Sequence, residues 1–274
     1  MLRIRIISAS VGVPLVLLAI WLGFPGIIAL ATVAGLIAGF EIHLLMCPAT
    51  YYLGSVRIVS ITMGPPVLAA ISSWMAANDQ ITGEQLPVIL VIIFTLALLL
   101  RGIGSLRRKS LRSSDWVFWV FAAYVGLTLA HAPLLVGLDS GRKLILMAII
   151  TTFVVDTVAM LVGVYAGRSR LAPSISPKKS WEGAVAGVVA GILVAIAIDV
   201  AFEVGFNTST AAILGGSLGV TAILGDLYES WIKRRAGVKD SGRLIPGHGG
   251  ILDRLDSVIP CLVVVYWIGV WNGL

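Results

Sequence analysis

Residues 226–256 combine acidic and basic side chains, and the carboxylates give the first chemical prediction. Asp253 and Asp256 are three residues apart, so they share one face if a helix begins there. Asp226 precedes them at the end of an apolar stretch, and the three carboxylates meet if the two segments pack side by side. Carboxylates hold Mg²⁺, a hard cation that also takes phosphate oxygens. We therefore predict a magnesium site formed by Asp226, Asp253 and Asp256.

Positive charge and a glycine turn accompany these carboxylates. Residues 246–250 read Pro-Gly-His-Gly-Gly, and glycines leave the backbone open for close approach to a ligand. Two interpretations of His248 remain open: it contacts phosphate, or it only fixes the turn. Besides Asp226 and Asp253, the candidate catalytic residues of this segment are Lys239, Asp240, His248 and Arg254. The candidate substrate-binding residues here are Lys233, Arg234, Gly249 and Gly250.

A second basic segment, residues 167–183, reads GRSRLAPSISPKKSWEG and precedes a long apolar stretch. Ser180 is suited to cap a helix there, with Glu182 in its first turn. Lysines beside the free backbone N–H groups of a helix start form an anion site. Ser176, Lys178 and Lys179 are therefore predicted to bind phosphate; the alternative is a basic loop that only sets membrane orientation.

A metal site, many cations and a glycine turn together suggest phosphoryl or nucleotidyl transfer. The spacing of the residues does not name the nucleotide.

The elements that position these residues are predicted to be membrane helices. The 274 residues are 58% hydrophobic and 12% charged, against about 25% charged in a typical soluble domain. About 20 apolar residues cross a bilayer, and about nine segments are candidates. They are 6–23, 26–45, 56–76, 86–100, 116–138, 143–166, 184–203, 209–229 and 257–273. The segment 86–100 is short, so it is either extended by its flanks or re-entrant.

We expect an all-α, polytopic membrane protein built as a single domain, residues 1–274. Within it, residues 1–140 form an N-terminal helical half and residues 141–274 a catalytic half. With this segmentation, the Lys and Arg residues other than Arg142 and Lys143 fall on one side. The positive-inside rule makes that side cytoplasmic, which places the N-terminus and the candidate site there. The basic loop 101–112 serves this orientation, and the net charge of +6 does not indicate a nucleic-acid partner.

Asp156 lies within the apolar segment 143–166. An ionisable residue inside a membrane is expensive and is expected to be functional. Asp156 is therefore a candidate substrate-binding residue, and the alternative is a hydrogen bond between helices.

Residues 230–256 resemble the signature of the phosphatidate cytidylyltransferase (CDP-diacylglycerol synthase) family. The matching positions are Ser230, Lys233, Arg234, Lys239, Asp240, Gly242, Pro246, His248, Gly249, Gly250, Asp253, Arg254 and Asp256. Gly225-Asp226, 171–173 and 176–183 match further family stretches. The segment after Asp156 departs from the family pattern, because Val158 and Met160 replace a glycine and a tyrosine. The first half resembles the family only in being hydrophobic and helical.

The resemblance implies an enzyme of phospholipid biosynthesis in the bacterial cytoplasmic membrane. Such an enzyme condenses CTP with phosphatidic acid to give CDP-diacylglycerol and pyrophosphate, with Mg²⁺ and with K⁺ as a candidate second cation. The resemblance also implies a homodimer. The lipid phosphate is already anionic, so positioning and charge neutralisation would supply the catalysis.

Three other functions are alternatives for this sequence. A related transferase would use an isoprenoid or ether-lipid acceptor, which sequence does not distinguish. A transporter is disfavoured because acids and bases gather at one face of the predicted topology. A degenerate scaffold is disfavoured because the stretch 230–256 is intact.

Overall fold

The computed structural model describes residues 2–46, 52–77, 116–242, 244–245 and 249–274. The chain divides into two compact units. The first unit comprises Met1–Gly137 and Arg235–Asp253, and the second comprises Leu138–Arg234 and Arg254–Leu274. The segment that carries the family signature is thus shared between the units, with divisions after Arg234 and after Asp253.

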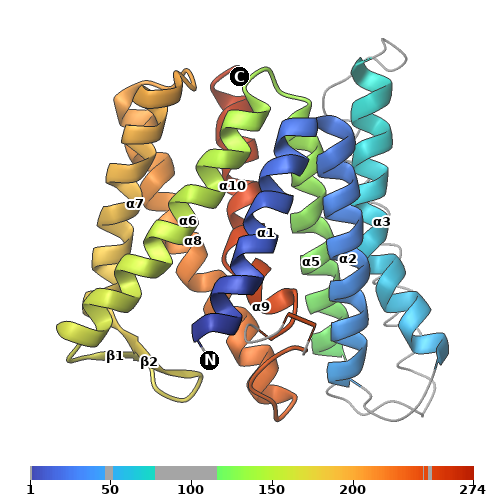
Figure 1. The fold of residues 1–274 in the computed structure, drawn as a ribbon, viewed down its shortest axis with the longest axis vertical. Coiled ribbons are helices and arrows are strands. Elements are labelled where there is room, and N and C mark those ends of the chain that lie inside the picture. The colour runs from blue at the N-terminus through green and yellow to red at the C-terminus, as the bar shows by residue number, and fades with distance from the viewer. Residues whose placement is uncertain (1, 47–51, 78–115, 243, 246–248) are drawn as a thin grey trace. The chain divides into compact units, whose positions relative to one another are not determined.

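Four long helices build the first unit: α1 (Leu2–Leu22), α2 (Phe24–Met46), α3 (Tyr52–Ala77) and α5 (Trp116–Val136). Helices α2, α3 and α5 pack on one another, and α1 packs on α2 (Figure 1). Small residues bring the backbones close: Thr62 of α3 donates a 2.7 Å hydrogen bond to the carbonyl oxygen of Gly35 on α2. Such close approach is typical of helices that pack without a hydrophobic driving force.

The second unit holds α6 (Gly141–Tyr165), α7 (Trp181–Phe202), most of α8 (Thr208–Arg235) and α10 (Val258–Trp271). Glycines let these helices touch. A Cβ on Gly191 of α7 would lie 2.7 Å from the carbonyl oxygen of Gly215 on α8, and one on Gly187 would lie 3.1 Å from that of Val155 on α6. The glycine spacing of α7 therefore serves close helix packing.

A two-stranded antiparallel hairpin connects α6 to α7 (Figure 1). It consists of β1 (Arg170–Ala172) and β2 (Ser176–Ser180). The sequence predicted a cytoplasmic loop here, and the structure instead forms this short hairpin. Pro177 is compatible with a strand here because a two-stranded sheet consists of edge strands.

The predicted helical segments are confirmed wherever the structure describes them; segment 86–100 lies outside the described residues. Five described helices are long and apolar enough to cross a membrane: Phe24–Leu45, Val117–Val136, Gly141–Tyr165, Trp181–Phe202 and Thr208–Arg235. Shorter apolar helices are Ser10–Leu22, Ile58–Ile71 and Val258–Trp271. The chain is an integral membrane protein with several candidate spans, while nine crossings, their orientation and the single-domain organisation stay predictions.

Two details of the sequence reading are wrong. Asp253 and Asp256 do not lie on one continuous helix, because α9 (Leu252–Leu255) ends before Asp256 and α10 begins only at Val258. Asp256 occupies the turn between them. Helix α8 also continues to Arg235, so Asp226 lies inside the helix rather than at its end.

Candidate active site

In the second unit, the β1–β2 hairpin brings a lysine to a carboxylate of α8. Lys179 Nζ lies 2.7 Å from Asp226 Oδ2, and both side chains are partly exposed. The strand ends at Ser180, whose hydroxyl oxygen accepts a 3.2 Å hydrogen bond from the backbone N–H of Gly183. This cap, predicted from the sequence, fixes where β2 stops and α7 starts, and so fixes Lys179 one residue earlier.

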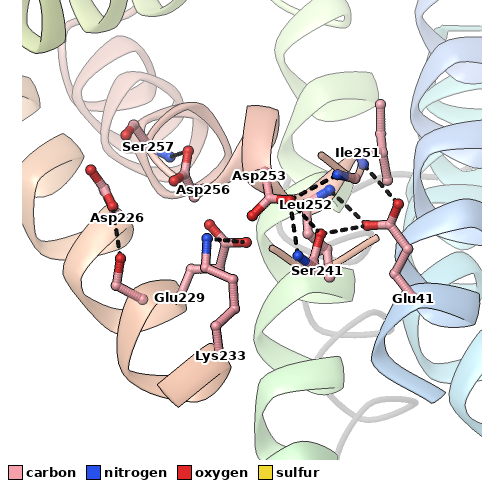
Figure 2. Close-up of polar contacts among 12 residues, drawn as sticks. Glu41, Asp226, Glu229, Lys233, Ser241, Ile251, Leu252, Asp253, Asp256 and Ser257 are labelled. Carbon is pink, nitrogen blue, oxygen red and sulfur yellow. Dashed lines mark hydrogen bonds and ion pairs between the residues drawn. The ribbon is translucent and has the colours of Figure 1, made fainter. Parts of the chain in front are cut away.

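The next turns of α8 continue the polar face (Figure 2). Ser230 Oγ donates to Asp226 Oδ1 over 3.2 Å. One turn further, Lys233 Nζ lies 3.3 Å from Glu229 Oε1, and both residues are buried. Buried ions of opposite charge four residues apart on a helix stabilise each other only as a pair, because removing either leaves an uncompensated charge. Lys233 is therefore engaged with Glu229 rather than held out to solvent.

Asp256 is a second carboxylate of this unit, and it interacts electrostatically with Asp226. Its Oδ1 accepts a 2.8 Å hydrogen bond from the backbone N–H of Ser257. Burial, and next the negative charge of Asp226, raise the pKa of Asp256. Asp156 of α6 belongs to the same group, since it hydrogen-bonds Ser257 and interacts electrostatically with Asp256, Asp226 and Lys179. In the second unit, Lys179 thus lies beside Asp226 and interacts with Asp156, while Asp256 acts on both of these carboxylates.

In the first unit, Asp253 organises the turn that precedes it. Its Oδ2 atom accepts hydrogen bonds from the backbone N–H of Ser241 (2.9 Å), the Ser241 hydroxyl (3.0 Å) and the backbone N–H of Gly250 (2.8 Å) (Figure 2). Gly249 has a φ of +84°, and a Cβ there would overlap Asp253 Oδ2. Glycine is therefore required at this position both for its backbone conformation and for the space it leaves.

The remaining predicted site residues are placed as follows. Lys178, Lys239, Asp240 and Arg254 are exposed, and Ser176 is partly exposed at the start of β2. Arg234 Nε donates to the carbonyl oxygen of Ile175 over 3.4 Å, which brings α8 to the tip of the hairpin. His248 lies outside the described residues, so both of its interpretations stay open.

Known proteins match this chain along nearly its whole length. The cytidylyltransferase family matches residues 3–271. A phosphatidate cytidylyltransferase of Mycobacterium bovis is 32% identical over 267 residues, which cover 95% of this chain and 85% of the relative. The chain belongs to the cytidylyltransferase family. The resemblance found in residues 230–256 is thereby confirmed and extends to the N-terminal half.

Other relatives of the cytidylyltransferase family match mainly one half of the chain. The phosphatidate cytidylyltransferase of Pseudomonas aeruginosa is 48% identical over 134 residues, covering 47% of this chain and 49% of the relative. That of Mycobacterium leprae is 42% identical over 145 residues, covering 53% of this chain and 46% of the relative. Identity is higher in these shorter alignments than in the long one, so similarity to the family is not spread evenly along the chain.

The carboxylates of the second unit suit a divalent cation. Asp226 and Asp256 repel each other, and a bound cation would reverse the rise in the pKa of Asp256. Hard oxygen ligands of this kind select Mg²⁺ over softer metals. Within the described residues of either unit, no three His, Cys, Asp or Glu side chains lie close enough to ligate one ion together. The predicted set of Asp226, Asp253 and Asp256 stays a prediction.

Sequence reasoning missed Glu41. This residue of α2 is 4% exposed and hydrogen-bonds the segment around Asp253. The signal was available, because Glu41 is the single acidic residue of the apolar stretch 26–45, and the argument that singled out Asp156 applies to it equally.

Proposed function

We propose that this protein transfers the cytidylyl group of CTP to phosphatidic acid, giving CDP-diacylglycerol and pyrophosphate. The observation that carries the proposal is the Lys179–Asp226 pair with Asp256, within a chain matched to the cytidylyltransferase family over residues 3–271. A cation-binding pair of carboxylates beside a phosphate-binding lysine is the arrangement that nucleotidyl transfer requires.

The reaction balances without a redox or acid–base partner. An oxygen of the phosphatidate phosphate attacks the α-phosphorus of CTP and forms a new P–O bond. The bond from that phosphorus to the bridging oxygen of the β-phosphate breaks, and pyrophosphate leaves with the electron pair. Because the nucleophile is already ionised at neutral pH, the protein has to position two anions and neutralise their repulsion.

The residues of the two units divide this work. From the second unit, we assign Lys179, Lys178 and Ser176 of β2, Arg234 of α8 and Arg254 to the phosphates, because β2 and the adjoining end of α8 lie together. Lys233 supports the site through its pair with Glu229. From the first unit, we assign Lys239, Asp240, Gly249 and Gly250 to the substrates and leave His248 with its two roles. Asp156 orients Ser257 and adds charge beside Asp256.

We assign Asp226, Asp253 and Asp256 to Mg²⁺, with K⁺ as a candidate second cation. When bound, Mg²⁺ supplies positive charge to the phosphate oxygens and lowers the cost of bringing two anions together. Asp226 holds the Lys179 ammonium in place in the absence of substrate, which prepares the phosphate-binding side of the site.

The membrane setting follows from the chemistry of the acceptor. The acyl chains of phosphatidic acid stay in lipid while its head group lies at the interface, and CTP arrives from water. We propose that the N-terminus and the site face the cytoplasm, because nearly all Lys and Arg residues fall on that side of the predicted topology. A bacterial cytoplasmic membrane and a homodimer are parts of the same proposal; its ligands are CTP, phosphatidic acid and membrane lipid, without nucleic acid.

The deciding experiment uses the purified full-length chain in mixed micelles with phosphatidic acid, Mg²⁺ and each of the four ribonucleoside triphosphates. Pyrophosphate release and the lipid product are followed together. The expected result is CDP-diacylglycerol formed with CTP alone and lost when the metal is chelated. Product formed only when an isoprenoid phosphate replaces phosphatidic acid would overturn the acceptor, and no product with any nucleotide and either lipid would overturn the activity.

A further inference from the structure

Glu41 is a buried carboxylate on α2 whose hydrogen bonds all reach a segment about two hundred residues away. Its Oε1 accepts from the backbone N–H of Ile251 (2.8 Å), and its Oε2 accepts from the backbone N–H of Leu252 (3.0 Å) and from Ser241 Oγ (2.9 Å). All of these residues belong to the first unit, and Figure 2 shows them converging on Glu41. Both carboxylate oxygens are thus used to hold one short piece of backbone.

The Ser241 hydroxyl connects Glu41 to Asp253. Ser241 Oγ lies 2.9 Å from Glu41 Oε2 and 3.0 Å from Asp253 Oδ2. A hydroxyl carries one proton and donates to one carboxylate at a time. The serine is therefore held between two carboxylates, and a displacement of Glu41 changes the hydrogen bonding available to Asp253.

The glycines of the segment leave room for Glu41. A Cβ on Gly242 would lie 2.8 Å from Glu41 Oε1. A Cβ on Gly250 would overlap both Glu41 Oε2 and Ser241 Oγ. Gly242 and Gly250 belong to the family signature, and this packing gives a physical reason for glycine at both positions.

We propose that Glu41 is a positioning residue: it holds Ser241 and residues 250–253 through its hydrogen bonds with Ser241, Ile251 and Leu252, and so fixes the carboxylate of Asp253. This role in catalysis rests on the proposed function, whereas the role in holding the segment does not. Glutamate suits it because both of its oxygens accept. Glutamine would turn an N–H group toward one set of donors and could accept with one oxygen only. Aspartate is one methylene shorter, so its oxygens would lie farther from these donors.

The first test measures backbone hydrogen exchange of the full-length protein in detergent micelles, so it does not depend on any substrate. In Glu41→Gln, the amides of Ser241 and of residues 250–253 should exchange about 10-fold to 100-fold faster, because hydrogen bonds to a charged group are lost. The matched control is Asp199→Asn, since Asp199 is also buried and accepts from the backbone N–H groups of Gly205 and Phe206 in the second unit. That variant should leave exchange at 241–253 as in wild type.

Unchanged exchange at Ser241 and at residues 250–253 in folded Glu41→Gln would overturn the proposal. If that variant does not fold, Ser241→Ala decides by the same measurement, because it removes the hydroxyl between the two carboxylates and keeps the backbone N–H groups that donate to Glu41. Faster exchange at 250–253 supports the proposal, and wild-type exchange overturns it.

The second test asks whether the held segment matters to the reaction. In the micelle assay, Glu41→Gln should lower kcat with little change in the KM for CTP. A Glu41→Gln, Asp253→Asn double variant should be no slower than Asp253→Asn, because a residue that acts through another gives non-additive effects. If the double variant loses turnover by the product of the two single losses, Glu41 does not act through Asp253. Accelerated exchange together with no activity even in wild type would instead refute the proposed function and leave the positioning of the segment standing.

Discussion

The substitution Asp253→Asn separates the two tasks of this carboxylate, which are to hold the turn and to carry negative charge. Asp253 Oδ2 accepts from Ser241 N, Ser241 Oγ and Gly250 N. The amide oxygen of asparagine has the same shape and accepts from the same donors, so the turn is kept. Each bond changes from charged to neutral, and the free energy of unfolding should fall by about 1–3 kcal/mol in total.

Turnover should fall much further than this loss of hydrogen bonding suggests. Removing one preorganised charged group from a phosphoryl-transfer site costs about 100-fold or more in kcat, or roughly 2.7 kcal/mol. The assay is CTP-dependent pyrophosphate release at saturating phosphatidic acid, alongside thermal unfolding in the same micelles. Asp199→Asn is the control, because it neutralises another buried, backbone-bonded carboxylate and should leave turnover unchanged. Near-normal turnover in Asp253→Asn, with a modest loss of stability, would refute the assignment of Asp253 to the reacting phosphates and their cation.

Three further changes test other parts of the site. Lys179→Ala should lower turnover about 10-fold or more and weaken CTP binding, because it removes a charge paired with Asp226 at 2.7 Å. The measurement is kcat and the KM for CTP. The control Lys143→Ala, which loses a hydrogen bond to a backbone carbonyl, should change neither. Gly250→Ala should lower kcat and destabilise the protein by about 1–3 kcal/mol in thermal unfolding, because its Cβ overlaps two oxygens; Gly12→Ala, with no atom within 4 Å, should do neither. In metal-free protein, Asp256→Asn should raise the unfolding temperature at neutral pH, because folding raises the pKa of Asp256 and so disfavours its charged form. This gain in unfolding temperature should shrink as the pH falls through the raised pKa. It should vanish below the ordinary carboxyl pKa, where Asp256 is protonated in both the folded and the unfolded state. A gain in unfolding temperature that grows toward low pH would contradict this prediction for Asp256→Asn.

Local signals in the sequence predicted the local structure well. The apolar stretches became helices wherever they are described, and Ser180 caps α7 as its position before Trp181 and Glu182 indicated. The family assignment followed from the dense pattern in residues 230–256 and is confirmed over nearly the whole chain. These features depend on residues within a few positions of one another, which is the range that propensity and motif arguments cover.

The failures share a different physical origin. Asp253 and Asp256 were expected on one helix face, but a turn between α9 and α10 separates them, and no local residue preference announces that break. The connection 167–183 was expected to be a loop, but its strands β1 and β2 form only by pairing with each other. Glu41 stands out in the sequence as the one acidic residue of an apolar stretch, but its partners are 200 to 211 residues distant, so the sequence does not show what it holds. Only the folded first unit shows which segment this carboxylate serves.

The energetics of Glu41 indicate that it contributes position more than stability. A carboxylate within a membrane helix costs about 2.5–3.5 kcal/mol, and more where no water reaches it. Its three hydrogen bonds each return about 1.5–3 kcal/mol, less the conformational entropy of the segment they order. Fixing the backbone of each of the three donor residues costs about 1–2 kcal/mol, which brings the two sides to a similar size. An apolar residue at this position would therefore leave the helix nearly as stable but the segment unheld. Glu41 therefore adds little to the free energy of folding, and its main contribution is to fix the position of Asp253. The N-terminal half then contributes to the chemistry through the one acidic residue of α2, as well as anchoring the chain in lipid.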